Sequence, residues 1–299
     1  TCSLIVSMLR SAGKTVHLVG NIGTPALEAL PTITNEDVVV YELSSFQLWD
    51  IKKSPHIAVV LGIEPDHLDI HEDFDEYLTA KANIRRYQGQ DEVCYYHPTN
   101  EFSHQIAMAG EWPEDEEEQK IWQDQAFRYA TTEAVYVQDG NFMMHGSIIC
   151  STSAVQLPGD FNIENACAAI SAARSFTVDN DAVESGLRAF TGLPHRLKFV
   201  AEKNGVKYYD DNYSSAPSAT IAAIHAFTEP EVLILGGYDK KINLSNLAIE
   251  LSHQRNLKHV VLIGQTGPQL QELLQANGYD KVSLLDNHPS MQVIVRTAY

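Results

Sequence analysis

HIAVVLGIEPDHLDIHEDFDEYLTAKANIRRY, residues 56–87, contains the two patterns that decide the fold. Residues 56–63 form a short apolar run rich in Val and Ile, which predicts a buried strand. Residues 76–87 have the spacing of a helix. Residues 64–73, between these two segments, include seven acidic or imidazole side chains: Glu64, Asp66, His67, Asp69, His71, Glu72 and Asp73. This order predicts a β–α unit, and ligands of such units lie beyond the carboxyl end of the strand.

The same alternation runs along the rest of the chain. Further strands are predicted at 16–20, 37–43, 92–97, 134–138, 206–211, 231–237, 259–264 and 281–285. Further helices are predicted at 164–176, 181–190, 217–227, 243–254 and 267–276, after a first helix that Gly13 ends. Strand–helix alternation indicates an α/β fold with mostly parallel sheets.

Three stretches interrupt the alternation. Residues 98–133 are polar, and their acidic run PEDEEE (113–118) is expected to be a solvated loop or helix start. YVQDGNFMMHG (136–146) predicts a β-hairpin around an Asp-Gly turn. Strand–helix alternation restarts after the Gly- and Pro-containing stretch FTGLPHRLKFV (190–200), so we predict two domains, 1–191 and 192–299.

The bulk composition excludes several classes of protein. The 299 residues are 44% apolar and 20% charged, as in globular proteins, and their net charge is −18. Such a charge repels nucleic-acid phosphates and anionic lipids, so neither is expected as a partner. No apolar run is long enough to cross a membrane. The cysteines are far apart and form no CxxC pair, which favours a reducing, cytoplasmic location: Cys2, Cys94, Cys150 and Cys167.

Glu42, Asp66 and His67 are candidate metal ligands. Glu42 ends a very apolar strand, where a carboxylate is costly unless it is paired or binds a metal. Asp66 and His67 follow the next predicted strand. Because the ends of neighbouring strands lie close together, the three side chains could converge on one hard cation such as Mg²⁺.

Two other interpretations of these residues stay open. Glu42 could cap the following helix, for which Ser44 and Ser45 are also natural caps. His67 and His71 have a helix-compatible spacing and could form a transition-metal pair. The zinc-protease signature does not fit, because Leu68 follows His67 where that signature requires Glu.

Lys81 stands between Ala80 and Ala82 on the predicted helix 76–87. One interpretation is an ordinary surface lysine. The other is a lysine whose amine is kept neutral by burial and reacts with CO₂. The resulting carbamate replaces a cation with an anion that can bind a metal ion.

Polar residues also follow other strands or open helices. Asn21 lies in a glycine turn that can bring backbone amides close to an anion, and Asn162 with Asn165 could cap a helix or present amides to a purine. Strand ends and the domain joint supply the remaining candidates: Arg196, Asp210, Asp211, Asp239 and Lys240.

Taken in order, these motifs resemble those of the Mur ligase family over essentially the whole chain. The motifs are GNIGTPAL (20–27), ELSSFQL (42–48), PDHLDIH (65–71), YLTAKANI (77–84), GDFNIENACAA (159–169), FTGLPHR (190–196), DDNYSSAPSAT (210–220) and LILGGYDK (233–240). The resemblance implies a central ATPase-like domain with a mostly parallel sheet, followed by a smaller Rossmann-like α/β domain. It also implies a monomeric, ATP-dependent ligase of peptidoglycan synthesis, which adds D-glutamate to UDP-N-acetylmuramoyl-L-alanine through an acyl phosphate.

The resemblance assigns a role to each candidate residue. Lys81 would be carbamylated and, with Glu42 and His67, would hold two Mg²⁺ ions. The muramoyl-alanine substrate would contact Asn21, Ser44 and Gln47. The nucleotide would contact Asn165 on its adenine side and Arg196 and Asp211 elsewhere, while Lys240 would face the incoming amino acid or the phosphates.

The chain departs from the family pattern in three ways. Tyr213 stands where the family has a lysine, and Phe161 where it has a histidine. The phosphate loop and the UDP-binding domain are expected before Thr1, and further strands after Tyr299. We therefore expect residues 1–299 to be part of a longer protein and to hydrolyse no ATP by themselves.

Two alternative functions remain. The related folylpolyglutamate synthase joins glutamate to folate by the same chemistry. A degenerate, non-catalytic nucleotide-binding module would fit Tyr213, although such a module would not need Glu42, His67 and Lys81 together.

Overall fold

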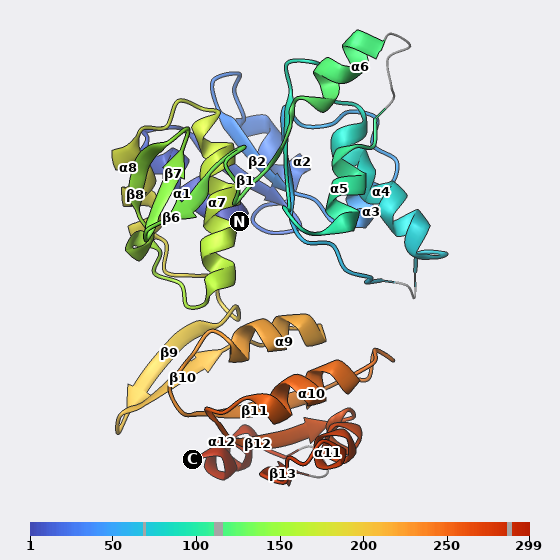
Figure 1. The fold of residues 1–299 in the computed structure, drawn as a ribbon, viewed down its shortest axis with the longest axis vertical. Coiled ribbons are helices and arrows are strands. Elements are labelled where there is room, and N and C mark those ends of the chain that lie inside the picture. Colours follow the sequence, from blue (N-terminus) through green and yellow to red (C-terminus); the bar gives the residue numbers. More distant parts are fainter. Residues whose placement is uncertain (68–69, 111–115, 286–288) are drawn as a thin grey trace. The chain divides into compact units, whose positions relative to one another are not determined.

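The computed structural model describes residues 1–67, 70–110, 116–285 and 289–299, which form two compact units (Figure 1). Unit 1 comprises residues 1–157 and 162–191. Unit 2 comprises residues 158–161 and 192–299. No helix in the described part of the chain is long and apolar enough to cross a membrane.

Unit 1 contains two parallel sheets, and the predicted α/β class with mostly parallel sheets is confirmed. β1 (Val16–Gly20) pairs with β2 (Val38–Glu42) in parallel. The other sheet has the order β3 (Ile57–Val60), β4 (Val93–Tyr96) and β5 (Ala126–Arg128). The parallel register pairs Gly20 with Glu42 and Val60 with Tyr96. The polar segments that follow these strands therefore leave the sheets at their carboxyl ends.

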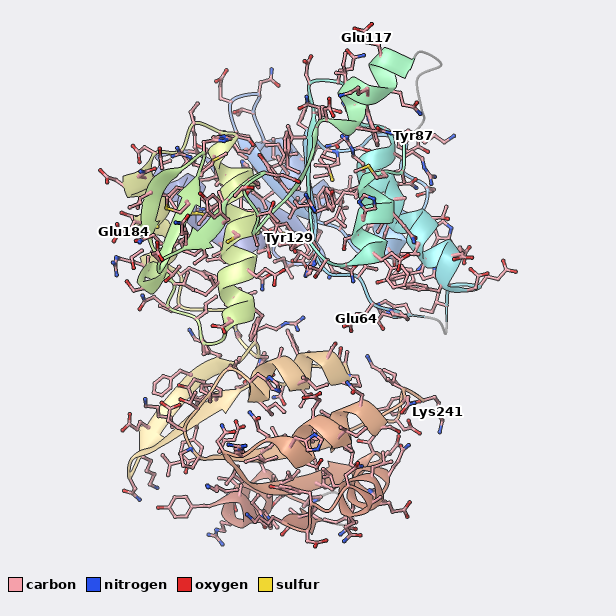
Figure 2. All side chains as sticks on the ribbon, in the orientation of Figure 1. Glu64, Tyr87, Glu117, Tyr129, Glu184 and Lys241 are labelled. Carbon is pink, nitrogen blue, oxygen red and sulfur yellow. The ribbon has the colours of Figure 1, made fainter. Side chains whose placement is uncertain are left out.

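The helices of unit 1 cover these sheets and pack against one another. They are α1 (Cys2–Ser11), α2 (Ala26–Ala29), η1 (Leu30–Thr32), α3 (Ser45–Leu48), α4 (Phe74–Arg86), α5 (Glu101–Ala107), α6 (Glu116–Gln123), η2 (Thr152–Ala154), α7 (Asp160–Arg174) and α8 (Asn180–Ala189). The predicted apolar face of α1 is buried. It approaches α8 closely because Gly186 has no side chain: a Cβ there would lie 2.5 Å from the Met8 Cα. Tyr129 lies inside unit 1, whereas Glu184 and Glu117 lie on its outside (Figure 2).

The predicted hairpin is present as β6 (Tyr136–Gln138) and β7 (Asn141–Met144). These two strands and β8 (Ser147–Ser151) form an antiparallel sheet. Asp139 and Gly140 form the turn with φ of 49° and 72°, the left-handed values that a type I′ turn requires. The sequence predicted this turn because Asp-Gly tolerates such backbone angles.

Arg85 anchors α4 from inside the protein. Its guanidinium is fully buried and stacks 3.6 Å from the ring centroid of Trp122. It donates to the backbone carbonyls of Ala107 and Trp122 and to the side chain of Gln88. A buried cation must be satisfied in this way, so Arg85 fixes the helix one turn beyond Lys81.

Unit 2 combines a hairpin with a three-stranded parallel sheet. The hairpin is β9 (Lys198–Lys203) and β10 (Val206–Asp210), and the sheet has the order β11 (Glu231–Gly237), β12 (Leu257–Gly264) and β13 (Val282–Leu284). Its helices are α9 (Pro217–Ile224), α10 (Ser245–His253), α11 (Gly267–Ala276) and α12 (Met291–Ala298). Leucines of α10, α11 and β12 form its separate core.

Candidate active site

Asn21 and Glu42 meet at the carboxyl ends of β1 and β2. The Asn21 backbone N–H donates to the Glu42 carbonyl at 2.8 Å, and its Nδ2 donates to Glu42 Oε1 at 3.2 Å. Gly20 permits this approach: its φ is +106°, and a Cβ there would lie 2.2 Å from the Glu42 carbonyl oxygen. The Cys2 thiol also lies beside Glu42. Burial raises the pKa of this thiol, and the Glu42 carboxylate contributes to the increase.

Ser44 and Gln47 bond to each other at the start of α3. The Ser44 hydroxyl accepts from the Gln47 backbone N–H, and Gln47 Oε1 accepts from the Ser44 backbone N–H at 3.0 Å. This capping box confirms the prediction that Ser44 caps the helix. The alternative in which Glu42 is the cap is wrong, because Ser44 occupies that position.

His67 and His71 lie on either side of Phe46. The Phe46 ring centroid is 5.1 Å from that of His67 and 5.2 Å from that of His71. His71 is buried, stacks on Trp49 at 4.5 Å and contacts the Ser45 hydroxyl at 3.0 Å through Nε2. His67 is exposed, with a φ of +55° that is not helical. The aromatic ring of Phe46 contacts both imidazoles, and the transition-metal pair stays a prediction. Asp69 lies outside the described residues.

Lys81 lies on α4 between the buried Ala80 and Ala82. Its ammonium is 4.9 Å from the ring centroid of Tyr77. Burial lowers the pKa of Lys81, while the nearby Asp66 carboxylate acts in the opposite direction. Burial, assisted by Asp66, also raises the pKa of Tyr77 to about 12. The surroundings thus favour a neutral amine at Lys81, as carbamate formation requires.

Oxygen donors dominate the candidate metal ligands. Within the described ranges, no group of three or more His, Cys, Asp or Glu side chains is arranged to hold a metal ion. A complete protein cage of that kind is not needed for Mg²⁺, which is usually held by one or two carboxylates together with phosphates and water. Glu42 is a half-buried carboxylate of this type, and Asp66 with His67 follows β3. The hard carboxylate oxygens of Glu42 and Asp66 therefore fit Mg²⁺ better than a softer metal.

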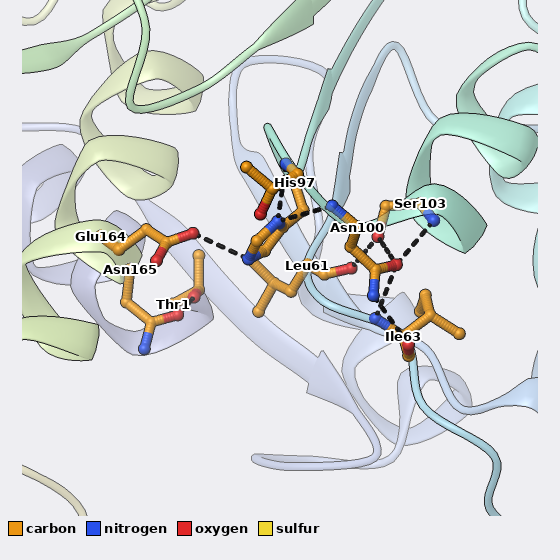
Figure 3. A network of polar contacts seen from close by, with 9 residues as sticks. Thr1, Leu61, Ile63, His97, Asn100, Ser103, Glu164 and Asn165 are labelled. Atoms are coloured by element: carbon orange, nitrogen blue, oxygen red, sulfur yellow. Dashed lines mark hydrogen bonds and ion pairs between the residues drawn. The ribbon is translucent and has the colours of Figure 1, made fainter. Parts of the chain in front are cut away.

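The first turns of α7 carry Asn162, Glu164 and Asn165, and Figure 3 shows the last two. Because α7 begins at Asp160, the prediction that Asn162 and Asn165 cap it is wrong, and both lie within the helix. Asn165 Oδ1 accepts from the Thr1 hydroxyl at 2.9 Å. His97, at the end of β4, contacts Glu164 at 2.8 Å. His97 was not predicted from the sequence, although its position after a parallel strand was a usable signal.

Two candidate residues of unit 2, Arg196 and Asp211, lie where the segment before β9 meets the end of β10. Arg196 Nη1 donates to the Tyr213 carbonyl at 3.0 Å, and its guanidinium is 5.7 Å from the Tyr213 ring centroid. Asp211 accepts from the Leu197 backbone N–H at 2.8 Å and from the Ser214 hydroxyl. Both predicted residues are thus brought into one hydrogen-bonded cluster.

Two more residues belong to this cluster, and the sequence analysis did not predict a role for either. His195 Nδ1 lies 2.6 Å from Asp210 Oδ2. Tyr213 packs 5.1 Å from the His195 ring and is 57% exposed. Lys240 is exposed after β11, where the neighbouring Asp239 pairs with Lys241 rather than with Lys240.

Comparison with known proteins places this arrangement in a family. The model of the Mur ligase middle domain matches residues 1–173. The UDP-N-acetylmuramoylalanine--D-glutamate ligases of Clostridium kluyveri and Acetivibrio thermocellus are 36% and 37% identical over 275 residues, which is 92% of this chain and 58% of each relative. The chain spans less than two thirds of the length of the curated relatives that it matches.

Solved structures show the same fold. MurF from Acinetobacter baumannii superposes with a TM-score of 0.67 at 17% identity, covering 98% of this chain and 73% of MurF. The folylpolyglutamate synthase of Mycobacterium tuberculosis, solved in complex with ADP, gives 0.66 at 15% identity, covering 99% and 79%. The fold alone therefore does not separate the two activities.

Proposed function

Because the chain belongs to the Mur ligase family, we propose that the complete protein is an ATP-dependent ligase that joins D-glutamate to UDP-N-acetylmuramoyl-L-alanine. The observation that carries this proposal is the 36–37% identity, over 92% of the chain, to curated ligases of that name. The ligase would act in the cytoplasm as a monomer, in peptidoglycan synthesis. Residues 1–191 would serve as the ATP- and Mg²⁺-binding domain and 192–299 as the C-terminal domain.

The proposed reaction forms one amide bond at the expense of ATP. The carboxylate of the muramoyl-alanine substrate takes the γ-phosphoryl group, which gives an acyl phosphate and ADP. The amine of D-glutamate then attacks the acyl carbon, loses a proton and displaces phosphate. Bound Mg²⁺ would neutralise charge on the transferring phosphoryl group.

Lys81 is the central residue of the proposed site. Its neutral amine would add to CO₂ and release a proton, so that a carbamate anion replaces the ammonium. The lowered pKa of Lys81 supports this step, because only the unprotonated amine is nucleophilic. With Glu42 and His67, the carbamate would supply ligands to two Mg²⁺ ions.

The other candidates would hold the substrates. Asn21, Ser44 and Gln47 would contact the muramoyl-alanine substrate, and the capping box supports this by keeping two of these side chains in one orientation. Asn165 would read adenine, since an Asn amide can pair with adenine N6 and N7. Arg196 and Asp211 would contact the rest of the nucleotide, and Lys240 the incoming amino acid or the phosphates.

Turnover of the complete protein with defined substrates tests the proposal. UDP-N-acetylmuramoyl-L-alanine, ATP, Mg²⁺ and D-glutamate should release phosphate and give a product heavier by one glutamate residue in mass spectrometry. L-glutamate should react far more slowly. Preference for a folate substrate would instead establish the folylpolyglutamate synthase activity. No turnover with either substrate, together with measurable ATP binding, would favour the non-catalytic module.

A further inference from the structure

His97 and Glu164 connect the end of β4 with the first turns of α7, although 67 positions separate them in the sequence. His97 Nε2 lies 2.8 Å from Glu164 Oε1 in an ion-pair contact, and that oxygen is buried without a hydrogen bond of normal geometry (Figure 3). The side chains of the pair are 22% and 38% exposed. The contact is therefore partly desolvated, and the attraction between an imidazolium and a carboxylate is screened less there than on an open surface.

The imidazole of His97 is held in one tautomer. Its Nδ1 accepts from the backbone N–H groups of Thr99 at 3.3 Å and Asn100 at 3.2 Å. An imidazole nitrogen that accepts carries no proton, so the proton of the neutral ring is on Nε2, the nitrogen that lies 2.8 Å from Glu164 Oε1. The edge-on ring of Tyr129, 5.7 Å away between centroids, fixes the ring from another side.

The network continues from Asn100 to the segment that follows β3. Asn100 Nδ2 donates to the Ile63 carbonyl at 3.0 Å, and its Oδ1 accepts from the Ile63 N–H at 3.3 Å. The Ser103 hydroxyl donates to the Leu61 carbonyl at 2.6 Å. Side chains of α5 and its cap therefore replace strand pairing, which explains why β3 ends at Val60 rather than at the predicted residue 63. The segment leads directly to Asp66 and His67.

At its other end the network reaches the proposed adenine-binding residue. Glu164 is adjacent to Asn165 on α7, and the Thr1 hydroxyl sets the orientation of the Asn165 amide by donating to Oδ1. The first turns of α7 are thus held from two sides, by His97 and by Thr1. One chain of contacts therefore joins Asn165, which would bind the adenine base, to the 61–67 segment, which carries candidate metal ligands.

We propose that His97 and Glu164 are positioning residues, which align Asn165 with the nucleotide base while holding the 61–67 segment for Mg²⁺. Neither side chain needs to touch the reacting atoms. This inference rests on the proposed function, because it takes Asn165 to be the adenine contact. Loss of the contact should weaken nucleotide binding and the response to Mg²⁺ together.

Two substitutions of His97 separate its two sets of contacts. His97→Asn places an amide oxygen near the position of Nδ1, so it keeps the acceptor for the two backbone N–H groups and loses the contact with Glu164. His97→Gln reaches the position of Nε2 and keeps a polar group beside Glu164. Glu164→Ala removes the contact, whereas Glu164→Gln retains an oxygen near His97. Glu184→Ala is the matched control, since Glu184 forms a surface ion pair with Arg188 in the same unit.

The measurement is calorimetric binding of a non-hydrolysable ATP analogue to the complete protein at several Mg²⁺ concentrations. Removal of an outer positioning partner typically lowers the affinity of a site by about tenfold or more. His97→Asn and Glu164→Ala should therefore each lower the affinity for the ATP analogue by about tenfold. Both should also require more Mg²⁺ for half-saturation. The two conservative variants and the control should stay within about threefold of the parent protein, since they keep the contact or lie outside the network.

The outcomes separate this proposal from the proposed function. Equal affinity in His97→Asn, His97→Gln and the parent protein would overturn the positioning role. A uniform loss of thermal stability in all four variants, without a change in affinity, would make the contact purely structural. Asn165→Ala tests the premise: if it leaves ATP affinity unchanged, the adenine assignment itself is wrong. Nitrogen-15 NMR of His97 should show the proton on Nε2, and a proton on Nδ1 would contradict the network.

Discussion

Lys81 in unit 1 and Lys241 in unit 2 show two opposite ways in which this protein treats an ammonium group. Lys81 lies between buried alanines on a helix, and burial lowers its pKa. Lys241 is 86% exposed at the surface of unit 2 (Figure 2), and its hydrogen bond to Asp239 at 2.6 Å raises its pKa. Burial therefore favours the neutral, reactive form of one lysine, while an ion pair favours the charged form of the other.

The same contrast extends to the remaining candidates. Those of unit 1 follow parallel strands or lie on helices, where Asn21 and His67 are exposed and Lys81 lies between buried alanines. Arg196 and Asp211 in unit 2 are held by hydrogen bonds between two loop segments. We infer that unit 1 supplies one lysine with altered reactivity, whereas loop contacts hold the candidates of unit 2.

The largest expected effect comes from Lys81→Ala in the complete protein. Loss of the proposed carbamate should reduce turnover by about a thousandfold, as for loss of a principal catalytic group. Added acetate or formate should restore part of the activity by taking the place of the carbamate. Lys241→Ala should retain turnover. Normal turnover of Lys81→Ala would exclude the carbamate.

A smaller effect is expected at Glu231 in unit 2, where burial acts on a carboxyl group. Burial raises the pKa of Glu231 to about 7, and its Oε1 has no hydrogen-bond partner. The folded state therefore binds more protons than the unfolded state between the ordinary Glu pKa and about 7, so stability should fall as pH rises through this range. With solvent screening, the loss should be roughly 2 kcal/mol.

Urea unfolding at pH 5 and pH 8 measures this effect. Glu231→Gln should remove most of the difference in unfolding free energy between the two pH values. Glu229→Gln is the control, because Glu229 is an exposed neighbour whose pKa is lowered by backbone N–H groups. A pH dependence that survives in Glu231→Gln would assign the effect to another group.

The smallest expected effect is on the free energy of unfolding, and substitutions of Lys81 and Lys241 are compared to measure it. Lys81→Met should raise the free energy of unfolding at pH 7 by about 1 kcal/mol, because it removes a partly desolvated charge. The parent protein should gain stability toward the ordinary lysine pKa, since the unfolded state then binds more protons. Lys241→Met should not raise the free energy of unfolding in this way, because the Lys241 ammonium is solvated. Equal unfolding midpoints for both variants would mean that Lys81 is not desolvated.

The sequence predicted elements wherever the local pattern was strong. The 2.0-residue and 3.6-residue periods located most strands and helices, and Asp139–Gly140 located the hairpin. β5, β8 and β9 were missed: β5 has three residues, β8 lies beyond the predicted hairpin 136–146, and β9 is largely exposed and charged. The start of α7 was placed too late, although Asp160 is an acidic residue of the kind that favours the first turn of a helix.

The amino-acid sequence by itself determined the α/β order, the hairpin turn, the Ser44 cap and the choice of Lys81 as a candidate, because each depends on neighbours within a few positions. Only the tertiary structure decided that Asp66 approaches Lys81 and Tyr77, that Thr1 bonds Asn165, and that His97 contacts Glu164. Such contacts depend on burial and strand register between distant segments, and no local periodicity encodes them.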